Sequence, residues 1–144
     1  MGNICRSPLA EAILRRQAQE KEVHIEVDSA GTGDWHVGER SDERAIRVGE
    51  NRGYAMTHRA RQVRPLDFQT FDLIVVMDDV NLRTLERLPN YPAEKVRLAR
   101  SFDPDADGRE VEDPYYGSQE EFETIADELE AACRGILLVV SRGS

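Results

Sequence analysis

Residues 1–14 of the chain read MGNICRSPLAEAIL, a polar turn that runs directly into an amphipathic segment. Ser7 and Pro8 predict the first turn of a helix, because a serine side chain accepts a hydrogen bond from an unpaired amide and proline already has a helical φ. The apolar positions of this helix share one face: Leu9, Ala10, Ile13 and Leu14. We expect the helix to end near Lys21.

The same stretch carries the groups that bind a phosphate. Several backbone amides must converge on the anion, a small residue must let the backbone approach it, and a guanidinium must grip two oxygens. Gly2, the loop amides and Arg6 supply these groups. Taken alone, the stretch is equally compatible with a Gly-Asn turn followed by a surface arginine.

Strand-like runs alternate with helical patterns along the rest of the chain. The strand-like runs are Val23 to Val27, Phe71 to Met77 and Lys95 to Phe102. The helical patterns cover Ser41 to Arg52, a segment capped by Asp78 or Asp79, and Ser118 to Arg134. Ile136 to Val140 fits either an extension of the last helix or a strand. This order predicts an α/β fold with a mostly parallel sheet.

The 144 residues and a hydrophobic fraction of 40% predict one domain over residues 1–144. The net charge of −9 opposes binding to nucleic acid or to an anionic membrane, so any phosphate site must be local. No apolar run is long enough to span a bilayer, and the N-terminus does not resemble a signal peptide, which predicts a cytoplasmic protein. Cys5 and Cys133 have no metal-type spacing and are expected to be reduced thiols.

The stretch Gly2-Asn3-Ile4-Cys5-Arg6-Ser7-Pro8 resembles the phosphate-binding loop of the low-molecular-weight protein tyrosine phosphatases, which reads Cys-x-Gly-Asn-x-Cys-Arg-Ser-Pro. Further family motifs follow in order, at Asp28–Thr32, Trp35–Gly38, Asp42–Ala45, His58–Gln62, Met77–Leu82 and Asp113–Gly117. The resemblance covers almost the whole chain. It implies a flavodoxin-like three-layer sandwich with a central parallel four-stranded sheet and the anion loop at the carboxyl edge of that sheet.

The family's nucleophile is the first cysteine of this loop motif, and the alignment places it one position before Met1. Cys5 does not take its place, because it adjoins Arg6 and matches the family's second loop cysteine. The first strand of the family's sheet also precedes the loop, between the segments 23–27 and 71–77. We therefore expect residues 1–144 alone to lack activity and to be poorly stable or rearranged, with Ile136 to Val140 as one substitute strand.

The resemblance implies roles for residues of this chain. The implied catalytic residues are Arg6, which stabilises the transferred phosphoryl group, and Asp113, the general acid. Phosphate binding falls to Gly2, Asn3, Ile4, Cys5, Arg6 and Ser7. The residues implied to support the loop are Asn3, Ser29 and His58. Those implied to contact the substrate ring are Trp35, Tyr115 and Tyr116. Ser7 also resembles the family's donor to the nucleophilic sulfur.

The implied reaction is hydrolysis of phosphotyrosine through a phosphocysteine, on a tyrosine-phosphorylated protein or a small aryl phosphate, without metal or organic cofactor. Inorganic phosphate, sulfate or vanadate are the expected ligands. One alternative is a non-catalytic module that binds phosphotyrosine or another anion. The related arsenate reductases need further resolving cysteines, and only Cys133 is present. Asp103 to Gly108 resembles the start of a calcium-binding EF-hand loop. The resemblance is rejected because Pro114 occupies the twelfth position, where the loop needs a glutamate.

Overall fold

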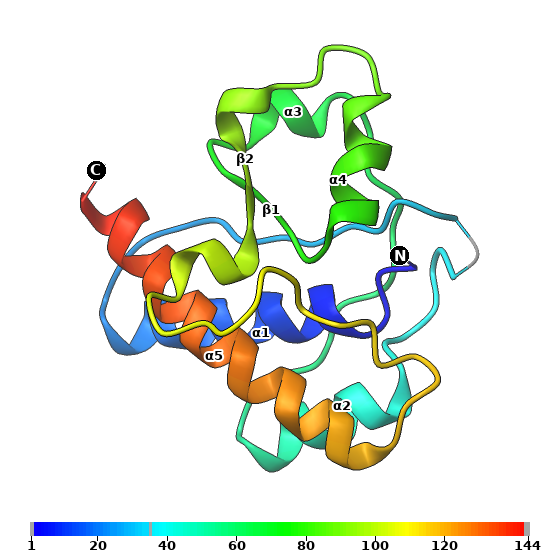
Figure 1. The fold of residues 1–144 in the computed structure, drawn as a ribbon. Coiled ribbons are helices and arrows are strands. Elements are labelled where there is room, and N and C mark those ends of the chain that lie inside the picture. Colours follow the sequence, from blue (N-terminus) through cyan, green and yellow to red (C-terminus); the bar gives the residue numbers. More distant parts are fainter. Residues whose placement is uncertain (1, 35, 143–144) are drawn as a thin grey trace.

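The computed structural model describes residues 2–34 and 36–142 (Figure 1). The α-helices are α1 (Arg6–Glu20), α2 (Glu43–Asn51), α3 (Asp67–Thr70), α4 (Asp79–Glu86) and α5 (Gln119–Arg142). The strands are β1 (Ile74–Val76) and β2 (Val96–Leu98), and two short 3-10 helices are η1 (Ala93–Lys95) and η2 (Ala99–Phe102).

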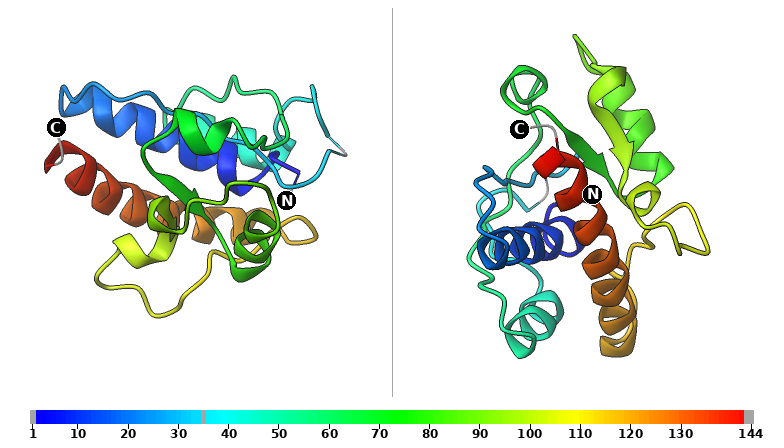
Figure 2. Two further views of the ribbon diagram at one scale, coloured as in Figure 1. Left: turned by 90° about the horizontal axis from the view of Figure 1, so that it is seen from above. Right: turned by 90° about the vertical axis from the view of Figure 1, so that its left-hand side faces the viewer.

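Strands β1 and β2 run parallel, with Ile74 opposite Val96 and Val76 opposite Leu98. They lie between a group formed by α1, α2 and α5 and a group formed by α3 and α4 (Figures 1 and 2). This arrangement confirms the predicted α/β class and the parallel pairing. The expected four-stranded sheet is not found, because the described part of the chain contains only these two paired strands.

Helices α1 and α5 pack against each other (Figure 2) and supply half of the residues of the main core cluster. The buried side chains that they share are Leu9, Ala12, Ile13, Phe122, Ile125, Ala126, Leu129, Ala132 and Cys133. Gly135 lets α5 approach η2, because a Cβ at this position would lie only 1.9 Å from the backbone oxygen of Phe102. Of the predicted apolar face of α1, Leu9 and Ile13 are buried, while Ala10 and Leu14 are half-buried and pack against the core.

One detail of the helices differs from expectation, and a second decides between two predicted alternatives. The cap of α1 is Cys5, which makes no side-chain capping bond, whereas Ser7 lies inside the first turn. Ile136 to Val140 is helical rather than a substitute strand, and within it Ile136 and Leu137 are buried while Leu138 and Val139 are exposed. The helical period therefore continues through this segment, and the last turns of α5 remain anchored on one side.

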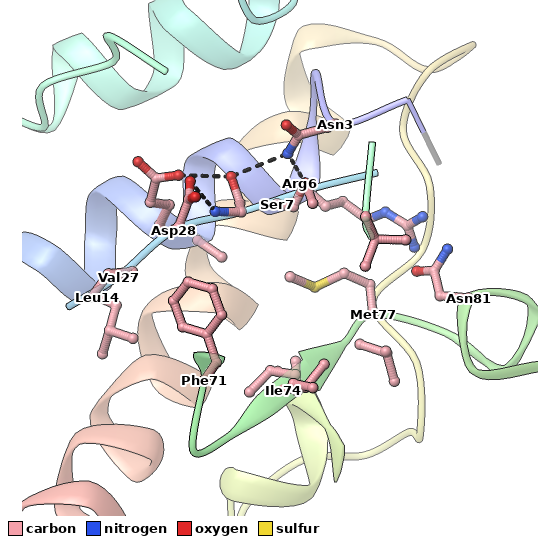
Figure 3. Close-up of a pocket in the computed structure, with 18 of the residues that line it drawn as sticks. Asn3, Arg6, Ser7, Leu14, Val27, Asp28, Phe71, Ile74, Met77 and Asn81 are labelled. Carbon is pink, nitrogen blue, oxygen red and sulfur yellow. Dashed lines mark hydrogen bonds between the residues drawn. The ribbon is translucent and has the colours of Figure 1, made fainter. Parts of the chain in front are cut away.

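Residues 23–29 form an extended segment without strand pairing in the described structure. A cavity of about 1430 Å³ lies between this segment, β1 and the facing sides of α1 and α5, and it extends to residues 2–7 and to Asp113 and Tyr115. Leu14, Val27, Phe71 and Ile74 border it (Figure 3). Val23 to Val27 was predicted as a strand, but a strand needs a neighbour for its backbone hydrogen bonds, and the cavity separates this segment from β1.

Among the helices of residues 2–34 and 36–142, none combines the length and the apolar character that crossing a membrane requires.

Candidate functional site

The loop of residues 2–7, hereafter loop 2–7, leads into the N-terminus of α1, where backbone amides have no partner within the helix. Asn3 has φ 62°, a left-handed conformation that asparagine tolerates better than most residues. At Gly2 an added Cβ would lie 2.5 Å from the His36 ring, so only glycine allows this contact. The loop is therefore compact and set at the positive end of a helix dipole.

The side chain of Asn3 holds loop 2–7 in this shape (Figure 3). Its amide nitrogen donates to Ser7 Oγ at 2.7 Å and to Ser29 Oγ at 3.1 Å. Its Oδ1 accepts from the backbone N–H of Arg61 at 3.0 Å and lies 2.5 Å from His58 Nε2. Asn3 is 3% exposed, so these bonds satisfy polar groups that would be costly to bury unpaired.

His58 and Glu11 complete this network. His58 Nδ1 lies 3.0 Å from Glu11 Oε1, which also accepts from Ser29 Oγ at 2.7 Å. Both nitrogens of the ring face acceptors, so both contacts are complete only when each nitrogen carries a proton. Burial acts to raise the pKa of Glu11, but the hydrogen bonds from His58 and Ser29 hold that pKa below its ordinary value. Asn3, Ser29 and His58 thus meet as expected, with Glu11 as an additional member.

The guanidinium of Arg6 is buried, and hydrogen bonds to Asp78 and Val111 fix its position. Nη1 donates to Asp78 Oδ2 at 2.7 Å and to the backbone oxygen of Val111 at 2.6 Å, and the side chain is 3% exposed. Nη2 lies 4.0 Å from Asp113 Oδ2. Asp78 also caps α4 by accepting from the N–H of Asn81 at 2.8 Å. The predicted cap therefore has a second task, which is to orient Arg6.

The carboxyl group of Asp113 lies at the rim of the same site, with its side chain 39% exposed. Its Oδ1 accepts from the N–H of Tyr115 at 3.1 Å. Val111 is held next to the end of β1, because its N–H donates at 2.9 Å to the backbone oxygen of Met77, the residue after this strand. Asp113 therefore stands on a short segment that is anchored on its N-terminal side, within reach of a group bound by Arg6.

The predicted ring contacts are only partly described. Trp35 lies outside the described residues. The Tyr115 ring lies 6.1 Å from the His36 ring and 4.9 Å from the Tyr116 ring, measured between centroids. Tyr115 is 37% exposed, and Tyr116 is 97% exposed. His36, which touches both Gly2 and Tyr115, joins the aromatic rim to loop 2–7.

Neither thiol of the chain has the properties of a nucleophile. Burial, reinforced by the carboxylates of Asp42 and Asp113, raises the pKa of Cys5 to about 12. Burial likewise raises the pKa of Cys133 to about 12. The Sγ of Cys133 lies 3.6 Å from the backbone oxygen of Ala10, on the packed face of α5. A nucleophilic cysteine needs a low pKa, so Cys5 and Cys133 both fail this requirement.

One group of side chains has the composition of a cation site. Ligand atoms of Glu11, Asp28 and His58 all lie within 4.8 Å of one another. Each of these residues already has a partner, however: Asp28 Oδ2 accepts from Arg61 Nε at 3.0 Å, and Glu11 accepts from Ser29 and His58. The group is accounted for as the support of loop 2–7.

Three residues of the site were not assigned from the sequence, namely Glu11, His36 and Asp78. His36 and Asp78 stand within family motifs, but their partners are far along the chain, and only Asp78 had been given a role, as a cap. Glu11 follows the loop motif directly on α1, but its position in the sequence does not show that its carboxylate contacts His58 and Ser29. Folding reveals all three, because each acts on a residue that another element carries.

Comparison with known proteins adds to this geometry. The family described as "Low molecular weight phosphotyrosine protein phosphatase" matches residues 1–143. A relative from Streptomyces coelicolor named "Low molecular weight protein-tyrosine-phosphatase" is 44% identical over 145 residues, which cover 96% of this chain and 88% of that protein. The motifs that carry the resemblance in sequence are therefore part of an alignment along the whole chain.

Solved structures of tyrosine phosphatases are similar to this structure along nearly the whole chain. A protein tyrosine phosphatase from Entamoeba histolytica with Hepes in the active site has a TM-score of 0.94 and 37% identity, covering 99% of this chain and 94% of that one. The tyrosine phosphatase Wzb from Escherichia coli K30, in complex with sulphate, has a TM-score of 0.82 and 33% identity, covering 96% and 93%. These likenesses confirm the flavodoxin-like α/β fold. The chain therefore belongs to the low molecular weight phosphotyrosine protein phosphatase family.

Proposed function

We propose that this site binds the phosphate group of a phosphotyrosine and serves its hydrolysis through a phosphocysteine. The observation that carries the proposal is the setting of Arg6, whose buried guanidinium is fixed by Asp78 and Val111 beside Asp113. A fixed guanidinium at a helix N-terminus stabilises the charge that spreads over the phosphoryl oxygens in the transition state.

Each remaining residue has a role in this proposal. The amides of loop 2–7 and Arg6 bind the phosphoryl oxygens, and Asp113 protonates the leaving phenolate and then activates water. Asn3, Ser29 and His58 hold the loop, and Ser7 orients the sulfur of the nucleophile. Trp35, Tyr115 and Tyr116 contact the substrate ring. The substrate is a tyrosine-phosphorylated protein or a small aryl phosphate.

The family's loop motif implies that the nucleophile is a cysteine thiolate six positions before Arg6. In residues 1–144, we propose that the site binds anions without turning them over. The raised pKa values of Cys5 and Cys133 support this second function of the polypeptide, since neither buried thiol is ionised near neutral pH. We further propose one domain over residues 1–144 and a cytoplasmic location, which the two free cysteines support.

Two measurements test the proposal. Titration of residues 1–144 with sulfate or vanadate, followed by NMR, should shift the amides of loop 2–7, and Arg6→Met should abolish the shift. A chain extended before Met1 by an apolar segment ending in cysteine should hydrolyse 4-nitrophenyl phosphate, whereas the same extension ending in serine should not. Anion binding without hydrolysis by the cysteine chain would leave the binding module as the function.

A further inference from the structure

Arg44, in the first turn of α2, reaches the segment that follows the proposed general acid. Its Nη1 donates to the backbone oxygen of Gly117 at 2.7 Å, and its Nη2 donates to that of Tyr115 at 2.6 Å. Residues 113–117, hereafter loop 113–117, also close on themselves, because the N–H of Gly117 donates to the backbone oxygen of Pro114 at 2.8 Å. One guanidinium thus binds two carbonyl groups of a single turn.

The guanidinium is itself held on its other edge and on one face. Arg44 Nε donates to Asp42 Oδ1 at 3.0 Å, and Nη2 donates to Asp42 Oδ2 at 3.0 Å. The guanidinium carbon lies 4.7 Å from the centre of the Phe122 ring on α5. Asp42 in turn caps α2, where its Oδ1 accepts from the N–H of Arg44 at 2.8 Å. A guanidinium fixed in this way has lost its side-chain freedom before it binds loop 113–117.

Asp42 and Arg44 together connect loop 113–117 to loop 2–7. The backbone N–H of Asp42 donates to the backbone oxygen of Ile4 at 2.8 Å. A continuous path therefore runs from Ile4 through Asp42 and Arg44 to Tyr115 and Gly117. Asp113 has few restraints of its own, because its side chain is 39% exposed and its nearest cationic partner, Arg6 Nη2, is 4.0 Å away.

We propose that Arg44 is a positioning residue that holds loop 113–117 in register with loop 2–7, so that Asp113 stands beside the group bound by Arg6. This proposal rests on the phosphatase function proposed above and names a residue that sets the geometry of its general acid. Arg44 acts through backbone carbonyls and touches neither the phosphate nor the leaving group. A lysine offers one compact ammonium in place of the two terminal nitrogens of the guanidinium, so it binds one carbonyl at most.

The chain offers a matched control for Arg44. Arg47 lies on the same helix and is exposed, and its Nη1 donates to Gln119 Oε1 at 3.4 Å. Arg44→Met keeps an apolar stem against Phe122 but removes every donor, Arg44→Lys keeps the charge without the fork, and Arg47→Met removes the same charge from α2. Differences between Arg44→Met and Arg47→Met therefore report the loss of the guanidinium contacts of Arg44, those to loop 113–117 together with those to Asp42 and the Phe122 ring.

Amide hydrogen exchange on residues 1–144 tests the positioning directly. Arg44→Met should speed exchange at Tyr115 and Gly117 by about tenfold or more, because each bond to a charged donor restrains the loop. Arg47→Met should leave both rates within about twofold of wild type. Equal rates in Arg44→Met and wild type would overturn the proposal. This readout needs no catalytic activity, so its result stands whether or not the phosphatase function holds.

Kinetics of the chain extended to its cysteine provide the second test. A displaced general acid harms a poor leaving group most, so Arg44→Met should lower kcat for phenyl phosphate about tenfold more than for 4-nitrophenyl phosphate. Arg44→Lys should fall between Arg44→Met and wild type. A merely structural loss would reduce both rates equally, by reducing the folded fraction, and that result overturns the positioning role. Absence of hydrolysis by the extended wild type would instead overturn the phosphatase function.

Discussion

Substitutions of Asp78 separate the two tasks of its carboxylate, which caps α4 through Oδ1 and holds Arg6 through Oδ2. Asp78→Ser keeps a side-chain oxygen for the cap but removes the charge that faces Arg6. The Arg6 side chain is 3% exposed, so its charge would be left with the backbone oxygen of Val111 as its nearest acceptor. Removing one partner of a buried ion pair is strongly destabilising, because the remaining charge stays desolvated.

The magnitude follows from burial and distance. Breaking a fully buried pair costs about 3–5 kcal/mol, and the 16% exposure of Asp78 together with the remaining bond to Val111 reduces this to about 2–4 kcal/mol for Asp78→Ser. Asp78→Ala should lose about 1 kcal/mol more, the usual value of a helix N-cap. Arg6→Met combined with Asp78→Ser should recover part of the loss, because no unpaired charge remains.

Urea unfolding of the four chains measures these differences, with the midpoint moving while the slope stays constant. Sulfate titration of the same chains then reports whether Arg6 keeps its orientation, and Asp78→Ser should bind sulfate more weakly than wild type. If Asp78→Ser were as stable as wild type and bound sulfate equally well, Asp78 would be a cap alone, and the orientation of Arg6 would have another cause.

Three further outcomes are expected. In the chain extended to its cysteine, Asp113→Ala should lower kcat by about 10²–10⁴, and more for phenyl phosphate than for 4-nitrophenyl phosphate; small equal losses would remove Asp113 from its role. The depressed pKa of Glu11 stabilises the fold above the ordinary value of 4.5, and this contribution is lost as pH falls through the folded pKa. Unfolding free energies at pH 6 and at about pH 3 should therefore differ more in wild type than in Glu11→Gln, and equal differences would contradict the network. The extended chain should also melt about 10 °C or more above residues 1–144, because an apolar strand would fill the cavity and pair with β1, and each kcal/mol is worth about 2–4 °C at this size. Coinciding melting curves would show that the cavity does not accept the strand.

Local chemistry in the sequence predicted much of the helical structure. The apolar residues of segment 9–14 recur at helical spacing, and Ser118 to Arg134 has a helical pattern, so α1 and most of α5 were expected. Asp78 or Asp79 was expected as the cap of α4, because an aspartate side chain accepts from an amide only a few residues away, and Asp78 is the one that does. The family resemblance likewise implied that Arg6 and Asp113 belong to one site.

The contacts that build the site depended on the tertiary structure. Arg6 meets Asp78, Asn3 meets His58, and Arg44 meets Gly117 only because separate elements pack side by side, and residue spacing carries no signal for such pairs. Pairing of Val23 to Val27 depended on a neighbour in the same way, and the segment stays extended beside a cavity. Hydrogen bonds within a helix are local and follow from its own residues, whereas strand pairing and the orientation of a buried charge are decided by what the fold places opposite them.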